Sequence, residues 1–195
     1  MSHSVYDVAI VGGGPAGLTA AMWLGRYRHS VVLVDSGDPR NWQTRGVNGY
    51  LGLPNVTPAA LRGAGRDEAR RYGAELIDGC VESVVRADDE GFRLALENGS
   101  TLAARRVLLA FGVKDIWPDI PGLEYSDCAT ADHCPYGDGH ETSGKKTVVI
   151  GVGRRAVGEH VAARHRITDL HQRTLVDAGV LVGALELHQP VDVDA

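Results

Sequence analysis

Three absences narrow the functions open to this chain of 195 residues. Its three cysteines, Cys80, Cys128 and Cys134, are too few and too unevenly spaced for a disulfide scaffold. Its charge has no basic excess, because 20 Lys and Arg stand against 25 Asp and Glu, so nothing favours nucleic acid as a partner. It also lacks an apolar run of membrane-spanning length, so we expect no membrane partner.

A targeting signal is also missing from the sequence. The segment MSHSVYD leads straight into an apolar run, with neither a basic region nor an apolar signal core, and we therefore expect a cytoplasmic protein. The composition, 44% hydrophobic and 23% charged, is ordinary for a globular protein. The length suits one large domain or two small ones.

What the chain does contain, close to its start, is a glycine-rich turn in a complete βαβ context. Val8–Val11 predicts a buried strand, a helical pattern begins at Pro15, and a second β-branched run, Val31–Val34, ends at Asp35. The turn between strand and helix fits G-x-G-x-x-G, with Gly12, Gly14 and Gly17. This combination is typical of dinucleotide binding.

Each residue of this motif has a physical task in that chemistry. Gly12 permits the tight turn, Gly14 lets the backbone approach a pyrophosphate, and Gly17 lets helix and strand pack closely. The phosphates would lie on free N–H groups at the positive end of the helix, and Asp35 would accept a hydrogen bond from a ribose hydroxyl. The alternative is a glycine-rich turn that binds no ligand.

Helices, a long loop and three extended segments follow. We expect helices over residues 15–28 and from the N-cap Thr57 to Tyr72, with a functional loop at 36–56 between them. On the second helix, Arg62, Arg66 and Arg70 share one face, which we interpret as solvated; a binding role is the alternative.

The extended segments predict a β-meander. They cover residues 75–86, 92–97 and 101–111, and Asn98-Gly99 is a strong hairpin signal between the last two. Within the first, Cys80 is interpreted as a small buried residue on a strand. The predicted fold is therefore an α/β, Rossmann-like βαβ sheet with an inserted β-meander.

A second, weaker nucleotide-binding start lies further along the chain. Thr147–Ile150 predicts a strand, and the G-x-G-x-x-A turn after it contains Gly151, Gly153 and Ala156. A plain strand–turn–helix is the alternative, because no second strand appears before Val180–Val182 and no acid or arginine pair follows it. We therefore expect only a partial second nucleotide-binding lobe.

Taken in order, these motifs resemble the thioredoxin-reductase-like branch of the FAD-dependent pyridine nucleotide-disulfide oxidoreductases. The resemblance runs from Tyr6 to about Val182. The matching blocks are GGGPAG (12–17), VVLVD (31–35), RGVNGYLGLP (45–54), RRYGAEL (70–76), LLAFGVKDIWPDIPGL (108–123), HCPYGDGHE (133–141) and GVGRRA (151–156).

The resemblance implies an FAD-binding domain over residues 1–116 and a partial NAD(P)H-binding domain over 117–195. NAD(P)H would bind at Gly151, Gly153 and Ala156. At Ala110-Phe111-Gly112 a ring replaces the hydroxyl of the family's usual Ala-Thr-Gly. The residues implied to hold FAD are Gly12, Gly14, Pro15, Ala16 and Gly17 for the pyrophosphate, Asp35 for the ribose, Asn48 and Gly49 near the flavin, Val81 for the adenine, and Gly112.

Two departures from the family pattern limit the expected chemistry. The family's redox motif has two cysteines separated by two residues, whereas here Cys134 is present and its partner position is Gly137. One thiol cannot cycle as a dithiol, so Cys128 is the alternative partner. Nothing after Val182 matches the family's Gly-Asp segment, so the C-terminal part of the FAD domain is expected to be absent.

The resulting hypothesis is an enzyme that passes electrons from NAD(P)H through FAD to a protein or small-molecule disulfide, or to another small acceptor. The alternatives are a non-catalytic relic that binds the nucleotide, and a flavin oxidoreductase that does not use its cysteines. No metal site is expected, because the metal-capable residues His133, Cys134, Asp138 and His140 lack zinc-type spacing. Exposed apolar strand positions, Val148 and Ile150, favour self-association as a homodimer or as aggregates.

Overall fold

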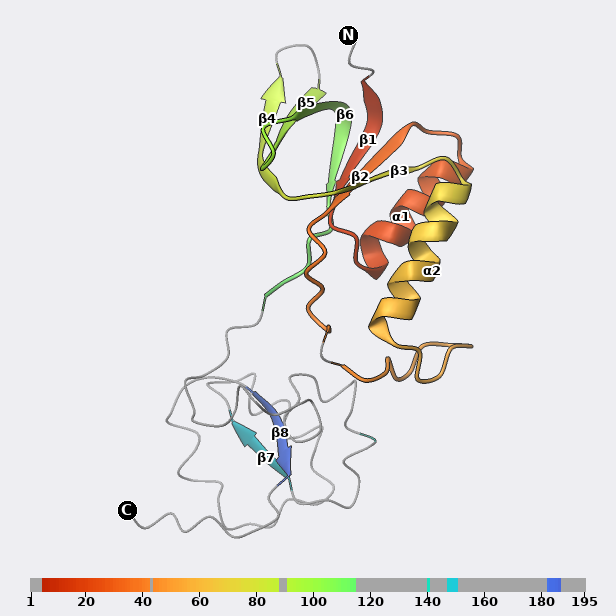
Figure 1. Cartoon of the computed structure of the whole chain (residues 1–195), viewed down its shortest axis with the longest axis vertical. Coiled ribbons are helices and arrows are strands. Elements are labelled where there is room, and N and C mark those ends of the chain that lie inside the picture. Colours follow the sequence, from red (N-terminus) through yellow and green to blue (C-terminus); the bar gives the residue numbers. More distant parts are fainter. Residues whose placement is uncertain are drawn as a thin grey trace, which may run out of the picture. The chain divides into compact units, whose positions relative to one another are not determined.

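The computed structural model describes residues 5–42, 44–87, 91–114, 140, 147–150 and 182–186. Contacts divide the chain into two units, Met1–Trp42 with Thr57–Lys114, and Gln43–Val56 with Asp115–Ala195 (Figure 1). The elements are β1 (Tyr6–Val11), α1 (Pro15–Arg26), β2 (Val31–Asp35), α2 (Pro58–Arg71), β3 (Glu75–Asp78), β4 (Val81–Ala87), β5 (Gly91–Leu96), β6 (Thr101–Leu109), β7 (Thr147–Ile150) and β8 (Val182–Glu186).

The first unit begins with the βαβ arrangement that the sequence predicts. β1 and β2 run parallel, with Val8 opposite Val31, and α1 connects them. The helix ends at Arg26, two residues earlier than expected, and Arg28 then takes a positive φ of 67°. This left-handed conformation cannot continue a helix, and the chain turns back to the sheet.

One mixed sheet of six strands, in the order β3-β2-β1-β6-β5-β4, organises the first unit. β6 joins the parallel and antiparallel parts of the sheet, since it runs parallel to β1 and antiparallel to β5. The hairpin between β5 and β6 turns at Asn98-Gly99, where Gly99 has a φ of 80°. The predicted α/β sheet with an inserted meander is confirmed, and Figure 1 shows both helices on one side of the parallel strands.

The segment predicted as one extended run over 75–86 is two strands instead. β3 pairs in parallel with β2, and β4 pairs antiparallel with β5. Between them Gly79 donates its N–H to the Asp35 carbonyl, while the Cys80 carbonyl accepts from Glu97 N. The chain thus leaves the parallel strands and joins the meander here, and Cys80 is exposed rather than buried. A uniform β propensity carries no signal for such a change of partner.

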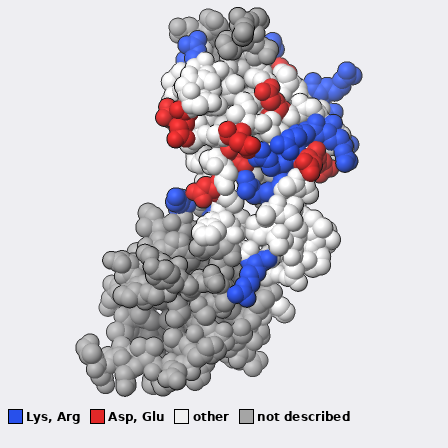
Figure 2. All heavy atoms as spheres, in the orientation of Figure 1, with Lys and Arg blue, Asp and Glu red and all other residues white. Residues whose placement is uncertain are grey.

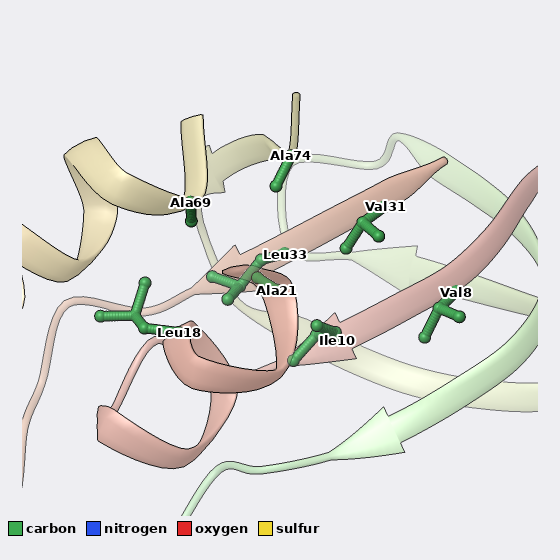
Figure 3. Packing of buried hydrophobic residues seen from close by; sticks show 8 residues of the cluster. All are labelled: Val8, Ile10, Leu18, Ala21, Val31, Leu33, Ala69 and Ala74. Carbon is green, nitrogen blue, oxygen red and sulfur yellow. The ribbon is translucent and has the colours of Figure 1, made fainter. Parts of the chain in front are cut away.

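The core lies on both faces of the parallel strands, as expected for strands that are covered on both sides. On the helical face, Ile10 and Leu33 pack against Leu18 and Ala21 of α1 and against Ala69 of α2 (Figure 3). On the opposite face, side chains of β1 and β2 pack against the meander. This second cluster contains Ala9, Val32, Val34, Leu94, Leu96 and Ala104.

The second helix begins and ends where its sequence signals indicate. The Thr57 hydroxyl accepts a hydrogen bond from Ala60 N at 3.2 Å, and Pro58 occupies the first turn. After the helix, Gly73 takes a φ of 86°. Apart from an isolated bridge between Val47 and Val56, residues 36–42 and 44–56 form neither helix nor strand, which confirms the predicted loop.

In the second unit the structure describes one strand pair. β7 confirms the strand predicted at residues 147–150, whereas β8 begins at Val182, later than the expected 180–182 strand. The two strands pair antiparallel. A βαβ unit needs parallel strands, so this pair does not supply one. Among the described residues, no helix is both long and apolar enough to cross a membrane.

Candidate functional site

The glycine turn after β1 is closely packed at two of its three motif positions. Gly12 has a φ of 109°, and a Cβ there would overlap the carbonyl of Ala110 at the end of β6. A Cβ at Gly17 would overlap the carbonyl oxygen of Gly12. These two glycines are therefore required by the fold, with or without a ligand.

Gly14 differs because the fold does not require it to be glycine. Its backbone is in the ordinary extended region, with φ −74° and ψ 177°, and a Cβ there would meet no atom within 4 Å. It is the N-cap of α1, whose first turn has neither a capping side chain nor an acidic residue. The N–H groups of the first turn of α1 therefore have no capping side chain, and Gly14 borders open space beside the exposed Pro15 and Ala16.

A buried carboxylate closes the other side of this turn. Asp35, at the end of β2, is 7% exposed. Its Oδ1 accepts hydrogen bonds from Gly13 N at 3.2 Å and from Gly37 N at 3.3 Å. A Cβ at Gly13 would overlap the Asp35 carboxyl group, so the middle residue of Gly12-Gly13-Gly14 must be glycine to make room for Asp35. The motif leaves that position free, and sequence reasoning missed it.

Two arginines from α2 complete the cluster. Arg62 Nη2 lies 2.6 Å and Arg66 Nη1 3.1 Å from Oδ2 of Asp35. Arg66 also reaches Asp78 Oδ1, at 2.5 Å. With side chains 19% and 15% exposed, Arg62 and Arg66 do not form the solvated face predicted for them. Arg70 does belong to the surface, since it is 51% exposed and pairs with Asp67.

The register of the parallel strands explains why arginines lie here. Asp35 and Asp78 are partners in the β2–β3 ladder, so two carboxylates stand side by side at the same edge of the sheet. Like charges at this spacing repel each other, and Arg66 bridges both. On the face drawn in Figure 2, basic and acidic side chains likewise lie beside one another. One sequence signal could have revealed this cluster. Asp35 and Asp78 each end a strand, and the helix between these strands has basic residues four positions apart.

The surroundings of Asp35 hold its carboxyl group in the charged form. Burial alone would raise its pKa, but hydrogen bonds from Arg62 and from the N–H groups of Gly37 and Gly13, together with the positive charge of Arg62, outweigh burial. The pKa of Asp35 is therefore lowered from its ordinary value. The site presents a fixed negative charge that two cations neutralise.

The other residues predicted to hold FAD lie outside the cluster around Asp35. Gly112 is exposed with a φ of 70°, two residues after the Ala110 carbonyl that abuts Gly12. Val81 is partly buried at the start of β4. Asn48 and Gly49 lie in the loop Gln43–Val56, which belongs to the second unit. The structure thus brings the glycine turn and Asp35 together.

The predicted redox and second nucleotide sites fall outside the described residues. This holds for Cys128, Cys134, Gly137, Gly151, Gly153 and Ala156. Of the four metal-capable residues only His140 is described, and it is exposed. Within the described part of the chain, no three His, Cys, Asp or Glu side chains gather as a metal site would require.

Comparison with known proteins places this geometry in a family. The sequence profile of the pyridine nucleotide-disulphide oxidoreductases matches residues 6–180. The chain belongs to this family. Among its curated relatives, the thioredoxin reductase tcpT of Claviceps purpurea is 35% identical over 155 residues, which make up 78% of this chain and 48% of that protein. The thioredoxin reductase of Bacillus subtilis is 29% identical over 187 residues, 93% of this chain and 58% of that protein.

Two solved structures resemble this chain in fold. The crystal structure of HlmI superimposes with a TM-score of 0.75 at 39% identity, over 82% of this chain and 51% of that one. The oxidoreductase from Agrobacterium tumefaciens gives a TM-score of 0.73 at 32% identity, over 82% and 54%. The chain therefore spans about half the length of the relatives it matches. The predicted resemblance to thioredoxin-reductase-like proteins is confirmed.

Proposed function

We propose that this chain is an FAD-dependent NAD(P)H oxidoreductase of the thioredoxin reductase type, and that its first unit holds the ADP half of FAD. The open position at Gly14 carries the proposal. The other glycines of the turn are closely packed and serve the fold, whereas Gly14 leaves room that no described residue uses. Room of that kind at a helix N-terminus suits a pyrophosphate.

The residues around Gly14 fit the group. The first-turn N–H groups of α1 would donate to the pyrophosphate, and Asp35 would accept from the adenosine ribose. Gly12 and Gly17 keep the turn close to β6 and the helix close to β1, which fixes those donors in place. Bound FAD would accept a hydride from NAD(P)H and release two electrons to an acceptor.

For the second half of the chain we propose the roles that the resemblance implies. Residues 1–116 would form the FAD domain, and residues 117–195 a partial NAD(P)H domain with its turn at Gly151. A disulfide acceptor takes up two electrons and two protons to become two thiols, which normally requires a cysteine pair in the enzyme. Because Gly137 stands in the partner position of Cys134, a flavin oxidoreductase that reduces its acceptor without cysteines is the second candidate.

A visible spectrum of the purified full chain tests the proposed function. After incubation with FAD and removal of free ligand, the protein is expected to retain a flavin band, and NADPH added without oxygen is expected to bleach it. Absence of a band would overturn FAD binding. A band that neither NADPH nor NADH bleaches would favour the non-catalytic alternative.

The variant Cys134→Ser then separates the two candidate reactions. If electrons leave through a thiol, the variant still bleaches with NADPH but loses reduction of a small disulfide probe. If both reactions persist, the cysteine is not used. Counting free thiols before and after chemical reduction reports whether Cys128 and Cys134 form a disulfide in the isolated protein.

A further inference from the structure

The Asp35 carboxylate has no vacant acceptor site in this structure. An ionised carboxylate offers about four lone-pair positions. Oδ1 accepts from Gly13 N and Gly37 N, and Oδ2 accepts from Arg62 and Arg66. A ribose hydroxyl that is to donate to Asp35 must therefore take the place of one of these four donors.

The four donors are not equally fixed. Gly13 N and Gly37 N belong to the backbone, and Arg66 is held at its other end by Asp78. Arg62 has one further contact, from its Nε to the Gly13 carbonyl, at 3.5 Å. A distance of 3.5 Å is the outer limit of a hydrogen bond and contributes little. Apart from its ion pair with Asp35, Arg62 is therefore the least constrained of the four donors.

Its departure also leaves the buried charge neutralised. Arg66 remains 3.1 Å from Oδ2 of Asp35, so the carboxylate keeps one cationic partner when Arg62 moves away. Removal of the last partner of a buried charge is strongly unfavourable, and the remaining Arg66 prevents that here. The Arg62 side chain is 19% exposed, so the guanidinium reaches water by rotation of its own side chain.

We propose that Arg62 is a displaceable side chain that occupies the ribose acceptor of Asp35 in the free protein and sets the affinity for adenine nucleotides by competition with the ribose diol. The inference rests on the proposed function and extends it. The ligands concerned are nucleotides that contain an ADP group with free 2′ and 3′ hydroxyls, such as ADP and FAD. A 2′-phosphate would bring a second negative charge close to Asp35.

The competition predicts an unusual direction for the effect of a substitution. If Arg62 occupies the acceptor for about nine tenths of the time, its removal raises the apparent affinity about tenfold, since binding no longer waits for the minor free state. The gain depends on the diol. It should therefore be large for ADP and FAD, and smaller for 2′-deoxy-ADP.

The test compares full-length wild type with Arg62→Met, which keeps the apolar stem and removes the donors. Arg70→Met is the matched control, since Arg70 lies on the same helix and pairs only with Asp67 at the surface among the described residues. Calorimetric titrations with ADP, 2′-deoxy-ADP and FAD give the dissociation constants. Circular dichroism and thermal unfolding establish that each variant is folded.

Tighter ADP binding by R62M, with a larger ratio of ADP to 2′-deoxy-ADP affinity and no change in R70M, supports the proposal. Weaker or unchanged binding by R62M, while the wild type binds, overturns the competition and leaves the proposed function intact. If neither wild type nor R62M binds ADP or FAD, the proposed function fails and the inference fails with it. Should R62M unfold, Arg62→Lys keeps a cation without the planar fork; a smaller gain in ADP affinity then supports the proposal, and no gain overturns it.

Discussion

At the scale of single residues, the glycine turn shows that adjacent glycines can exist for different reasons. Gly13 has no Cβ because Asp35 occupies that volume, whereas Gly14 has open space around the same position. The missing Cβ at Gly13 makes room for a buried carboxylate, and the missing Cβ at Gly14 makes room for a ligand under the proposal. Substitution by alanine separates the two reasons.

Gly13→Ala is expected to destabilise the protein, because the new methyl group must push the Asp35 carboxyl from its four donors. Overpacking of this kind costs about 1–3 kcal/mol, and loss of part of the hydrogen bonding adds to it. Gly14→Ala is expected to leave the free energy of unfolding nearly unchanged. Urea unfolding of both variants measures the difference, and equal destabilisation would contradict this account of the turn.

Acidification is expected to weaken the fold through Asp35. Because its folded-state pKa is lowered, Asp35 stabilises the folded state above its unfolded pKa of about 4, and this contribution is lost as the pH falls through the lower folded value. Asp35→Asn should be less stable at pH 7 and should lose less stability between pH 5 and pH 3. Asp67→Asn, at an exposed pair, is the control; an acid profile of Asp35→Asn identical to that of the wild type would refute the role of Asp35.

At the scale of elements, α1 and α2 approach closely through small residues. A Cβ at Gly25 would lie 2.6 Å from the Tyr72 carbonyl oxygen, and one at Gly65 would lie 3.1 Å from Leu18 Cδ1. The contact brings α2 near the sheet edge, where its arginines reach Asp35. The position of the cluster therefore depends on this helix pair.

Gly25→Ala is expected to force the helices apart and to lower the free energy of unfolding by about 1–3 kcal/mol. Gly63 lies on the same helix as Gly65, and a Cβ there would meet nothing within 4 Å. Gly63→Ala should therefore stabilise the protein by up to about 1 kcal/mol, because alanine favours a helix over glycine. Denaturant titrations of Gly25→Ala and Gly63→Ala measure the two changes in the free energy of unfolding. Destabilisation by both, to the same extent, would rule out the proposed packing.

A second contact between elements is expected to respond to alkali. The Tyr6 hydroxyl on β1 donates to Glu75 on β3, and burial, this hydrogen bond and the charge of Glu75 raise the pKa of Tyr6 to about 12. The stabilisation is present below the unfolded value of about 10 and is lost as the pH rises through about 12. Tyr6→Phe should therefore lose less stability between pH 10 and pH 12 than wild type, as followed by thermal unfolding; equal losses would contradict it.

The elements also show which information the sequence carried. Local signals, such as the cap at Thr57 and the Asn98-Gly99 turn, were sufficient because their causes lie within a few residues of chain. The break at Gly79-Cys80 and the inward-facing Arg62 and Arg66 were mispredicted. Both depend on which strand becomes the neighbour of β2, and this pairing joins residues far apart in the sequence.

At the scale of the whole molecule, the family could be identified from the sequence because its motifs are local and occur in a fixed order. The profile match over residues 6–180 and the 35% identity to the thioredoxin reductase tcpT bear this out. The candidate site was predicted in part: the turn and Asp35 meet as expected, while Gly13 and the arginines come from tertiary packing. The proposed redox position Cys134 lies outside the described residues and stays a prediction.

The central claim is that the space at Gly14 binds the pyrophosphate of FAD, and a fluorescence titration of FAD tests it most directly. The account predicts saturable binding by wild type and by Gly63→Ala, and at least about tenfold weaker binding by Gly14→Ala, equivalent to about 1.4 kcal/mol, with the unfolding curve unchanged. Equal FAD affinity in wild type and in folded Gly14→Ala would contradict it.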